Sequence, residues 1–188
     1  MTIPLRQPWT QDRFFAWAET QERRYEFDGF QPVAMNGGSW NHDRISRNIH
    51  LALRPRLRGT PCQTAGPNAG VATIGDIVRY PDALVTCSKG PGESRLIPGV
   101  VIVFEVLSPG SGGIDRIVKL REYLAVPSIK RYVILESALI GLTVLVKQSD
   151  GAWSASSLTA EDTLRLPEIG IEVPVTELYE DVEFMDTP

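Results

Sequence analysis

Residues 100–107 constrain the fold more than any other stretch of the chain, because they read Val-Val-Ile-Val-Phe-Glu-Val-Leu, with a single charged residue. An apolar run of this length, rich in β-branched residues, predicts a central strand covered on both faces. Glu105 interrupts it. A buried, unpaired carboxylate costs several kcal/mol, so Glu105 needs a cation, a set of hydrogen bonds or a proton. The alternative is a glutamate near a strand end that pairs with a lysine or arginine.

The remaining chain alternates helical and strand-like patterns. Apolar spacing predicts helices over residues 11–19, 42–54 and 114–125, and Pro55 is expected to end or kink the second. Strands are expected at 77–80, 83–86 and 131–135, with a hairpin joining 140–147 to 152–158 and a helical turn at 176–179. A further hairpin over residues 24–35 would turn at Asp28-Gly29. This order predicts an α/β fold, a mixed sheet flanked by helices, in one domain of residues 1–188.

Composition excludes some classes of protein. The 188 residues are 43% hydrophobic and carry a net charge of −4, which argues against disorder and against a charge-driven nucleic-acid coat protein. Two cysteines, Cys62 and Cys87, are too few for a disulfide scaffold, and we expect reduced thiols. The first residues lack the apolar run of a signal peptide, and no segment approaches a membrane span, so we expect a cytoplasmic protein.

A second carboxylate gives Glu105 a chemical context. Asp82 follows Pro81 in the short run of residues 79–86, where the alternative is an ordinary turn aspartate. Two neighbouring strands that each carry one carboxylate can present both to a single point. Hard divalent cations such as Mg²⁺ take oxygen ligands of this kind, and a metal with its waters can drive phosphodiester hydrolysis.

Lys119 lies on the predicted helix that follows the Glu105 strand. Asp115, Lys119 and Tyr123 are spaced four residues apart along one helical face. If this face turns toward the metal, the ammonium can orient a water or stabilise charge on phosphorus. The alternative, an exposed Asp115–Lys119 ion pair, is equally compatible with the spacing.

These motifs together resemble a bacterial family of restriction-endonuclease-like proteins in the PD-(D/E)XK nuclease superfamily. The resemblance extends over residues 9–179 and rests on an ordered set of motifs. They are residues 25–29 (Tyr-Glu-Phe-Asp-Gly), His42, Pro81-Asp82, residues 105–109 (Glu-Val-Leu-Ser-Pro), and the series Asp115, Lys119, Tyr123.

The resemblance implies a restriction-endonuclease-like core with Asp82 and Glu105 on adjacent strands, and Mg²⁺ or Mn²⁺ as cofactor. The activity it implies is that of a metal-dependent endonuclease acting on DNA. The superfamily usually places its catalytic lysine two residues after the acidic residue, where this chain has Leu107. Lys119 would take over that role from the next helix. Glu26 matches a further acidic position and could hold a second metal or bind the first through water; the alternative is a surface glutamate of the hairpin.

Other residues are candidates for substrate binding. Arg44 and Arg47 belong to a basic helix that would contact backbone phosphates, unless it is a solvated face. His42 and Tyr123 are expected beside the site, and Ser108 begins a glycine-rich loop that could hold an anion at a helix N-terminus. A homodimer is expected from the family's habit and from the need to engage two strands.

Two other functions are compatible with the sequence. An inactive nuclease-fold module that binds nucleic acid or a protein partner would fit the negative net charge and the absence of lysine at position 107. A hydrolase using Ser108 as nucleophile is a weaker alternative, because the chain has no Gly-x-Ser-x-Gly elbow.

Overall fold

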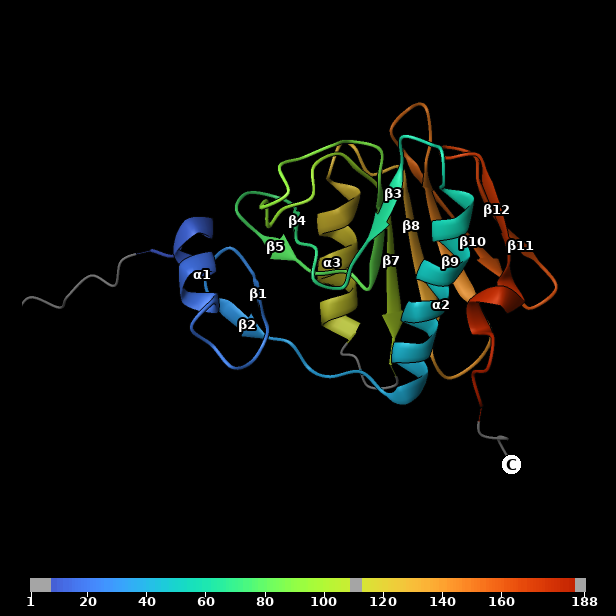
Figure 1. Ribbon diagram of the computed structural model, residues 1–188, viewed down its shortest axis with the longest axis horizontal. Helices are drawn as coiled ribbons and strands as arrows, with labels where there is room; N and C mark the ends of the chain where they lie inside the picture. The colour runs from blue at the N-terminus through green and yellow to red at the C-terminus, as the bar shows by residue number, and fades with distance from the viewer. Residues whose placement is uncertain (1–7, 109–112, 185–188) are drawn as a thin grey trace, which may run out of the picture.

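The computed structural model describes residues 8–108 and 113–184, without the side chains of residues 113–116 (Figure 1). Its centre is a six-stranded sheet in the order β10-β9-β8-β7-β6-β3. The strands are β3 (Gln63–Ala65), β6 (Ala83–Thr86), β7 (Val100–Leu107), β8 (Arg131–Glu136), β9 (Leu142–Lys147) and β10 (Trp153–Leu158). Among the described strands of this sheet, only β7 and β8 pair in parallel, and helix α3 (Gly113–Leu124) lies between them in the chain. The predicted mixed sheet is therefore confirmed.

Helices cover both faces of this sheet. On one face, α2 (Trp40–Arg56) buries Ile45, Ile49 and Leu53 in a cluster that includes Ile102 and Phe104 of β7. The opposite face carries Val103 of β7 and packs against α3. Successive strand residues point to opposite faces, so Glu105 shares the α3 face with Val103. The expectation that residues 100–107 form a strand covered on both sides is confirmed.

A second, four-stranded sheet brings the N-terminal segment to the α3 side of the molecule. Its order is β2-β1-β5-β4, with β1 (Tyr25–Phe27), β2 (Pro32–Ala34), β4 (Val71–Ala72) and β5 (Val78–Arg79). Helix α1 (Gln11–Ala18) packs on it, and the ring of Phe14 stacks on that of Phe27 at 5.4 Å. The β1–β2 hairpin turns at the predicted Asp28, whose Oδ1 accepts the N–H groups of Phe30 and Gln31.

The C-terminal part closes the α2 side. Strands β11 (Thr163–Leu166) and β12 (Ile171–Pro174) form a hairpin, and the 3₁₀ helix η1 (Val175–Tyr179) follows it. Leu178 and Tyr179 are buried in the same cluster as the apolar face of α2. The side-chain amide of Asn48 donates to the carbonyl of Glu180, which fixes this segment against α2. The predicted helical turn near residues 176–179 is confirmed as η1.

One boundary differs from expectation and one expectation is wrong. Helix α2 includes Pro55 and ends one residue after it, at Arg56. Proline has no N–H to donate to the carbonyl of Leu51, four residues earlier, and this missing hydrogen bond falls in the last turn of the helix. Cys62 and Cys87 form a disulfide, although reduced thiols were expected. The β3–β6 register, which pairs Gln63 with Thr86, continues to place these two cysteines opposite each other, a proximity that their sequence separation conceals.

The described residues contain no helix long and apolar enough to cross a membrane.

Tyr179 provides a test of how η1 is attached. Its hydroxyl donates to the carbonyl of Gly141 at 2.6 Å, and burial raises the pKa of Tyr179 to about 12. An unfolded tyrosine ionises near pH 10, so the stability contributed by neutral Tyr179 is present below pH 10 and is lost as pH rises toward 12. The parent should therefore lose about 2 kcal/mol more unfolding free energy than Tyr179→Phe across this interval. Urea denaturation at both ends of the interval measures the difference, and parallel losses would contradict it.

Candidate active site

Asp82 and Glu105 face each other across two neighbouring strands. Strand β6 runs antiparallel to β7 with Ala83 opposite Phe104, and the same register continued by one residue puts Asp82 opposite Glu105. Residues opposite each other in a ladder lie on the same face. Both carboxylates therefore belong to the α3 face of the sheet, as the sequence predicts for a shared point.

Asp82 is held at both carboxylate oxygens. The backbone N–H of Val106 donates to Oδ2 at 2.7 Å, and Nε2 of His42 lies 3.3 Å from Oδ1. This hydrogen bond outweighs desolvation and raises the pKa of His42 above its usual value. Gly38 allows the arrangement, because a Cβ at this position would lie 2.5 Å from Nδ1 of the imidazole. The first turn of α2 thus brings the predicted His42 to the carboxylate pair.

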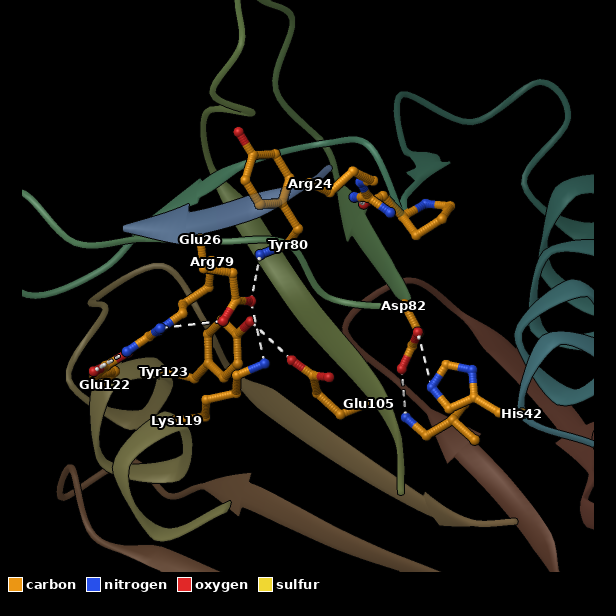
Figure 2. Close-up of polar contacts among 12 residues, drawn as sticks. Arg24, Glu26, His42, Arg79, Tyr80, Asp82, Glu105, Lys119, Glu122 and Tyr123 are labelled. Carbon is orange, nitrogen blue, oxygen red and sulfur yellow. Dashed lines mark hydrogen bonds and ion pairs between the residues drawn. The ribbon is translucent and has the colours of Figure 1, made fainter. Parts of the chain in front are cut away.

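Glu105 is the most electrostatically perturbed carboxyl group of this region. The residue is only 9% exposed, and the hydroxyl of Tyr123 donates to its Oε1 at 3.0 Å. Burial raises the pKa of Glu105 to about 8. Lys119 opposes this shift, while the negative charges of Asp82 and Glu26 add to it. Figure 2 shows Glu105 with Tyr123 and Lys119 on one side and with Asp82 and His42 on the other. Strongly perturbed carboxyl groups are typical of functional sites.

Lys119 reaches this point from α3 and is held there by Glu26 of β1. Its Nζ donates to Oε1 of Glu26 at 3.1 Å, and the backbone N–H of Tyr80 donates to the same oxygen at 3.2 Å. The other oxygen, Oε2, accepts a hydrogen bond from Arg79 at 3.1 Å. Glu26 is thus buried among donors and is not a surface residue of the hairpin. Its predicted contact with a metal competes with these three hydrogen bonds.

Arg79 and Glu122 complete the network and escaped the sequence analysis. Two hydrogen bonds join the Arg79 guanidinium to the Glu122 carboxylate, at 2.6 and 2.8 Å. Burial alone would lower the pKa of Arg79, but the hydrogen bonds to Glu122 and the charge of Glu26 outweigh it and raise that pKa. Arg79 lies three residues before Asp82 and Glu122 three residues after Lys119, but these spacings do not indicate that the two side chains pair.

Comparison with known proteins places this geometry in a family. Residues 11–176 match the model of the Uma2 family, described as "Putative restriction endonuclease". The chain belongs to the Uma2 family. One similar protein is "Uncharacterized protein slr1290" of the cyanobacterium Synechocystis, which is 30% identical over 176 residues, covering 92% of each chain. The resemblance inferred from the sequence motifs is confirmed.

A solved structure supports the fold of this Uma2 protein. The crystal structure of "a putative nuclease belonging to DUF820" from Anabaena variabilis superposes with a TM-score of 0.73 and covers 92% of this chain and 98% of that one. The two sequences are 14% identical, so the likeness concerns the fold alone. The expected restriction-endonuclease-like architecture is confirmed.

The predicted arginines have acidic partners in this Uma2 protein. Arg47 pairs with Asp43 at 2.6 Å, and Arg44 donates to the carbonyl of Asp181 at 2.8 Å. Neither contact belongs to the network around Glu105. Arg56 of the same helix pairs with Glu177. The basic helix is therefore partly neutralised by its own protein, which sequence clustering could not reveal.

The remaining candidates lie at the end of β7. Ser108 follows this strand directly and is half-buried. The rest of the glycine-rich loop, residues 109–112, lies outside the described residues, and so does the side chain of Asp115. His50 of α2 contacts the backbone at the site. Its Nε2 lies 3.3 Å from the backbone carbonyl oxygen of Asp82, and its Nδ1 lies 3.0 Å from the Thr64 hydroxyl.

The site suits a cation that two carboxylates share with water. Within the described ranges, no three or more histidine, cysteine, aspartate or glutamate side chains are arranged to hold a metal ion. Mg²⁺ does not need such a cage, since it usually binds one or two carboxylates and keeps several waters. The charge balance also fits: negative neighbours raise the pKa of Glu105, and a divalent cation between Asp82 and Glu105 would offset that repulsion.

Proposed function

We propose that this protein is a metal-dependent endonuclease that hydrolyses phosphodiester bonds of DNA. The observation that carries the proposal is the pairing of Asp82 with the buried Glu105 across β6 and β7, with Lys119 directed to the same point. The family description, "Putative restriction endonuclease", and the printed title of the Anabaena structure agree in naming nuclease activity. Dimerisation, cytoplasmic location and the single-domain organisation remain predictions.

Asp82 and Glu105 would hold Mg²⁺ or Mn²⁺ in this proposal. The bound ion would supply Lewis acidity and a water molecule of lowered pKa for attack on phosphorus. The protein prepares this site in two ways. The N–H of Val106 and the imidazole of His42 orient the Asp82 carboxylate, and the phenol of Tyr123 orients that of Glu105.

Lys119 is proposed to stabilise the charge that develops on the phosphoryl group. Its ammonium is close enough to Glu105 to lower the pKa of that carboxyl group, so it lies beside the proposed metal ligands. Preorganised cations of this kind act more strongly in a partly buried site than in water. We assign Glu26 the role of holding Lys119, since its hydrogen bonds to Lys119, Arg79 and the Tyr80 backbone occupy its oxygens.

Leu107 supports this role for Lys119. It stands where the superfamily usually has its lysine, and its side chain packs in the apolar cluster that contains Tyr123 and Tyr132. Position 107 therefore contributes apolar packing instead of an ammonium group. The ammonium group on this face of the sheet comes from Lys119 of α3. The absence of lysine at position 107 thus gives little support to an inactive module.

The proposal is tested by substituting both carboxylates. Titration calorimetry with Mn²⁺ is expected to show binding by the parent and none by Asp82→Asn or Glu105→Gln. Cleavage of supercoiled and linear DNA should fall by at least about 10²-fold in either variant, since charge stabilisation at the reacting phosphoryl group is lost. A matched control is Glu172→Gln, because Glu172 forms an exposed pair with Arg165 on the β11–β12 hairpin and should leave both properties unchanged.

Two other results would argue against the proposed nuclease activity. A double Asp82→Asn/Glu105→Gln variant that cuts DNA as fast as the parent would refute the proposal. Metal binding by the parent without turnover on DNA or RNA would favour the inactive module.

A further inference from the structure

A cavity of about 300 Å³ lies between the first turn of α2 and the C-terminal segment. Figure 1 shows the start of α2, the end of β7 and the C-terminal segment at the same end of the molecule. It is lined by Trp40, Asn41, Arg44, Asp181, Glu183 and Phe184. Its volume lies at the low end of the range for small-molecule sites. The network around Glu105 uses none of these residues.

Trp40 gives this cavity an open aromatic surface. The residue is 69% exposed although it is the first of α2, and the guanidinium carbon of Arg44 lies 5.3 Å from the centre of its ring. Arg44 is fixed in turn, because it donates to the carbonyl of Asp181 at 2.8 Å and lies 3.7 Å from the carboxylate of that residue. The arginine therefore supports the indole from one side and leaves aromatic surface for a second planar group.

The charge of the lining decides what that planar group is. Two carboxylates, of Asp181 and Glu183, accompany the single cation Arg44, and this excess of negative charge disfavours a phosphate. Carboxylate oxygens accept hydrogen bonds, and the exocyclic amino groups of nucleobases donate them. A flat, neutral base that carries such an amino group satisfies both the indole and the acidic rim.

The location connects the cavity with the candidate active site. Trp40 stands two residues before His42, whose imidazole lies 3.3 Å from Asp82. The cavity and the candidate active site therefore both adjoin the first turn of α2, although side chains two positions apart leave a helix on different sides. A nucleic-acid strand bound at the carboxylate pair would have to follow this turn to place a base in the cavity.

We propose that this cavity binds an unpaired cytosine, adenine or guanine of the substrate strand, stacked on Trp40 with its amino group toward Asp181 and Glu183. The inference rests on the proposed function in one respect, that the ligand is a nucleic acid. It adds a substrate class: the protein engages strands that have a base outside the duplex, as in single-stranded, frayed or flipped DNA. Stacking supplies affinity for every base, and the carboxylates disfavour thymine.

The test measures binding without cleavage, in the presence of a chelator. Fluorescence anisotropy with labelled single strands made only of cytosine or only of thymine gives the two affinities. The parent is expected to bind the cytosine strand more tightly. Trp40→Ala should weaken binding of both strands about 5- to 150-fold, as expected for the loss of one stacked base, while Trp40→Phe should weaken it less.

Further variants separate stacking from base preference. Asp181→Asn with Glu183→Gln should reduce the preference for cytosine and spare Trp40-dependent binding; asparagine also tolerates the positive φ of 57° at position 181. Phe30→Ala is the matched control, because Phe30 is an 84% exposed aromatic residue on the β1–β2 turn and its loss should change nothing.

Two outcomes would overturn the inference. The first is Trp40→Ala binding like the parent, and the second is a cytosine preference that survives removal of both carboxylates. Either result leaves the proposed function standing if Asp82→Asn still abolishes cleavage. Conversely, the protein could bind strands through Trp40 and still cut no nucleic acid with any divalent metal. That result would support the role of the cavity and refute the proposed nuclease activity.

Discussion

Arg79→Met is expected to lower the free energy of unfolding by about 3–5 kcal/mol, a typical loss when one partner of a buried ion pair is removed. The Arg79 side chain is 5% exposed and those of Glu26 and Glu122 are 7% and 5% exposed, so the substitution removes two hydrogen bonds from the buried Glu122 carboxylate and one of three from that of Glu26. Methionine retains most of the apolar volume. Urea denaturation monitored by circular dichroism at neutral pH measures the loss.

The matched control for Arg79 is Arg165→Met. Arg165 also pairs with a glutamate, but the side chains of Arg165 and Glu172 are 75% and 64% exposed, so the expected cost is below about 1 kcal/mol. A triple variant, Arg79→Met with Glu26→Gln and Glu122→Gln, should recover part of the stability, because it removes the stranded charges. Equal losses for Arg79→Met and Arg165→Met would show that the network contributes no more than a surface pair.

Lys119→Met is expected to reduce DNA cleavage by about 10²- to 10³-fold at saturating Mn²⁺, the effect of removing one preorganised group that stabilises transition-state charge. Metal binding, followed by calorimetry, should persist because lysine supplies no ligand oxygen. Lys130→Met is the control, since Lys130 is exposed and directly precedes β8. A Lys119→Met protein that retains the parent's cleavage rate would remove Lys119 from the mechanism.

Variants of Glu26 distinguish two roles for this residue in the same cleavage assay: positioning of Lys119 and binding of metal. If Glu26 acts by holding Lys119, the double variant Glu26→Gln/Lys119→Met should cleave no more slowly than Lys119→Met alone, because the two residues form one unit. If Glu26 holds metal independently, the two losses should multiply and Glu26→Gln alone should weaken Mn²⁺ binding. The first outcome is the one that the three hydrogen bonds to Glu26 favour.

The sequence predicts the central part of the fold well because its signals are local. The apolar run around Glu105 requires cover on both faces, and α2 and α3 provide it. Asp82 and Glu105 could be paired in advance because each interrupts an apolar strand, and residues opposite each other on neighbouring strands lie on the same face of the sheet.

The rest depends on contacts between distant segments. Arg79 binds Glu122, which lies 43 residues further along the chain, and no local pattern selects this partner among the other carboxylates. The same holds for Glu26 and Lys119, 93 residues apart. The disulfide was missed for a similar reason, since Cys62 and Cys87 become neighbours only through the β3–β6 register.

Glu26 and Glu105 lie on different sheets. This separation affects the fraction of molecules in which Lys119 is held beside Glu105. Strand β1 is three residues long, and its ladder with β5 consists of the single pair Phe27 and Val78. Short elements of this kind open locally at a lower free energy than a central strand such as β7. Each opening would release Lys119 while the Asp82–Glu105 pair stays folded. The fraction of molecules able to cut would then follow the local stability of the hairpin, and amide exchange at β1 would report it.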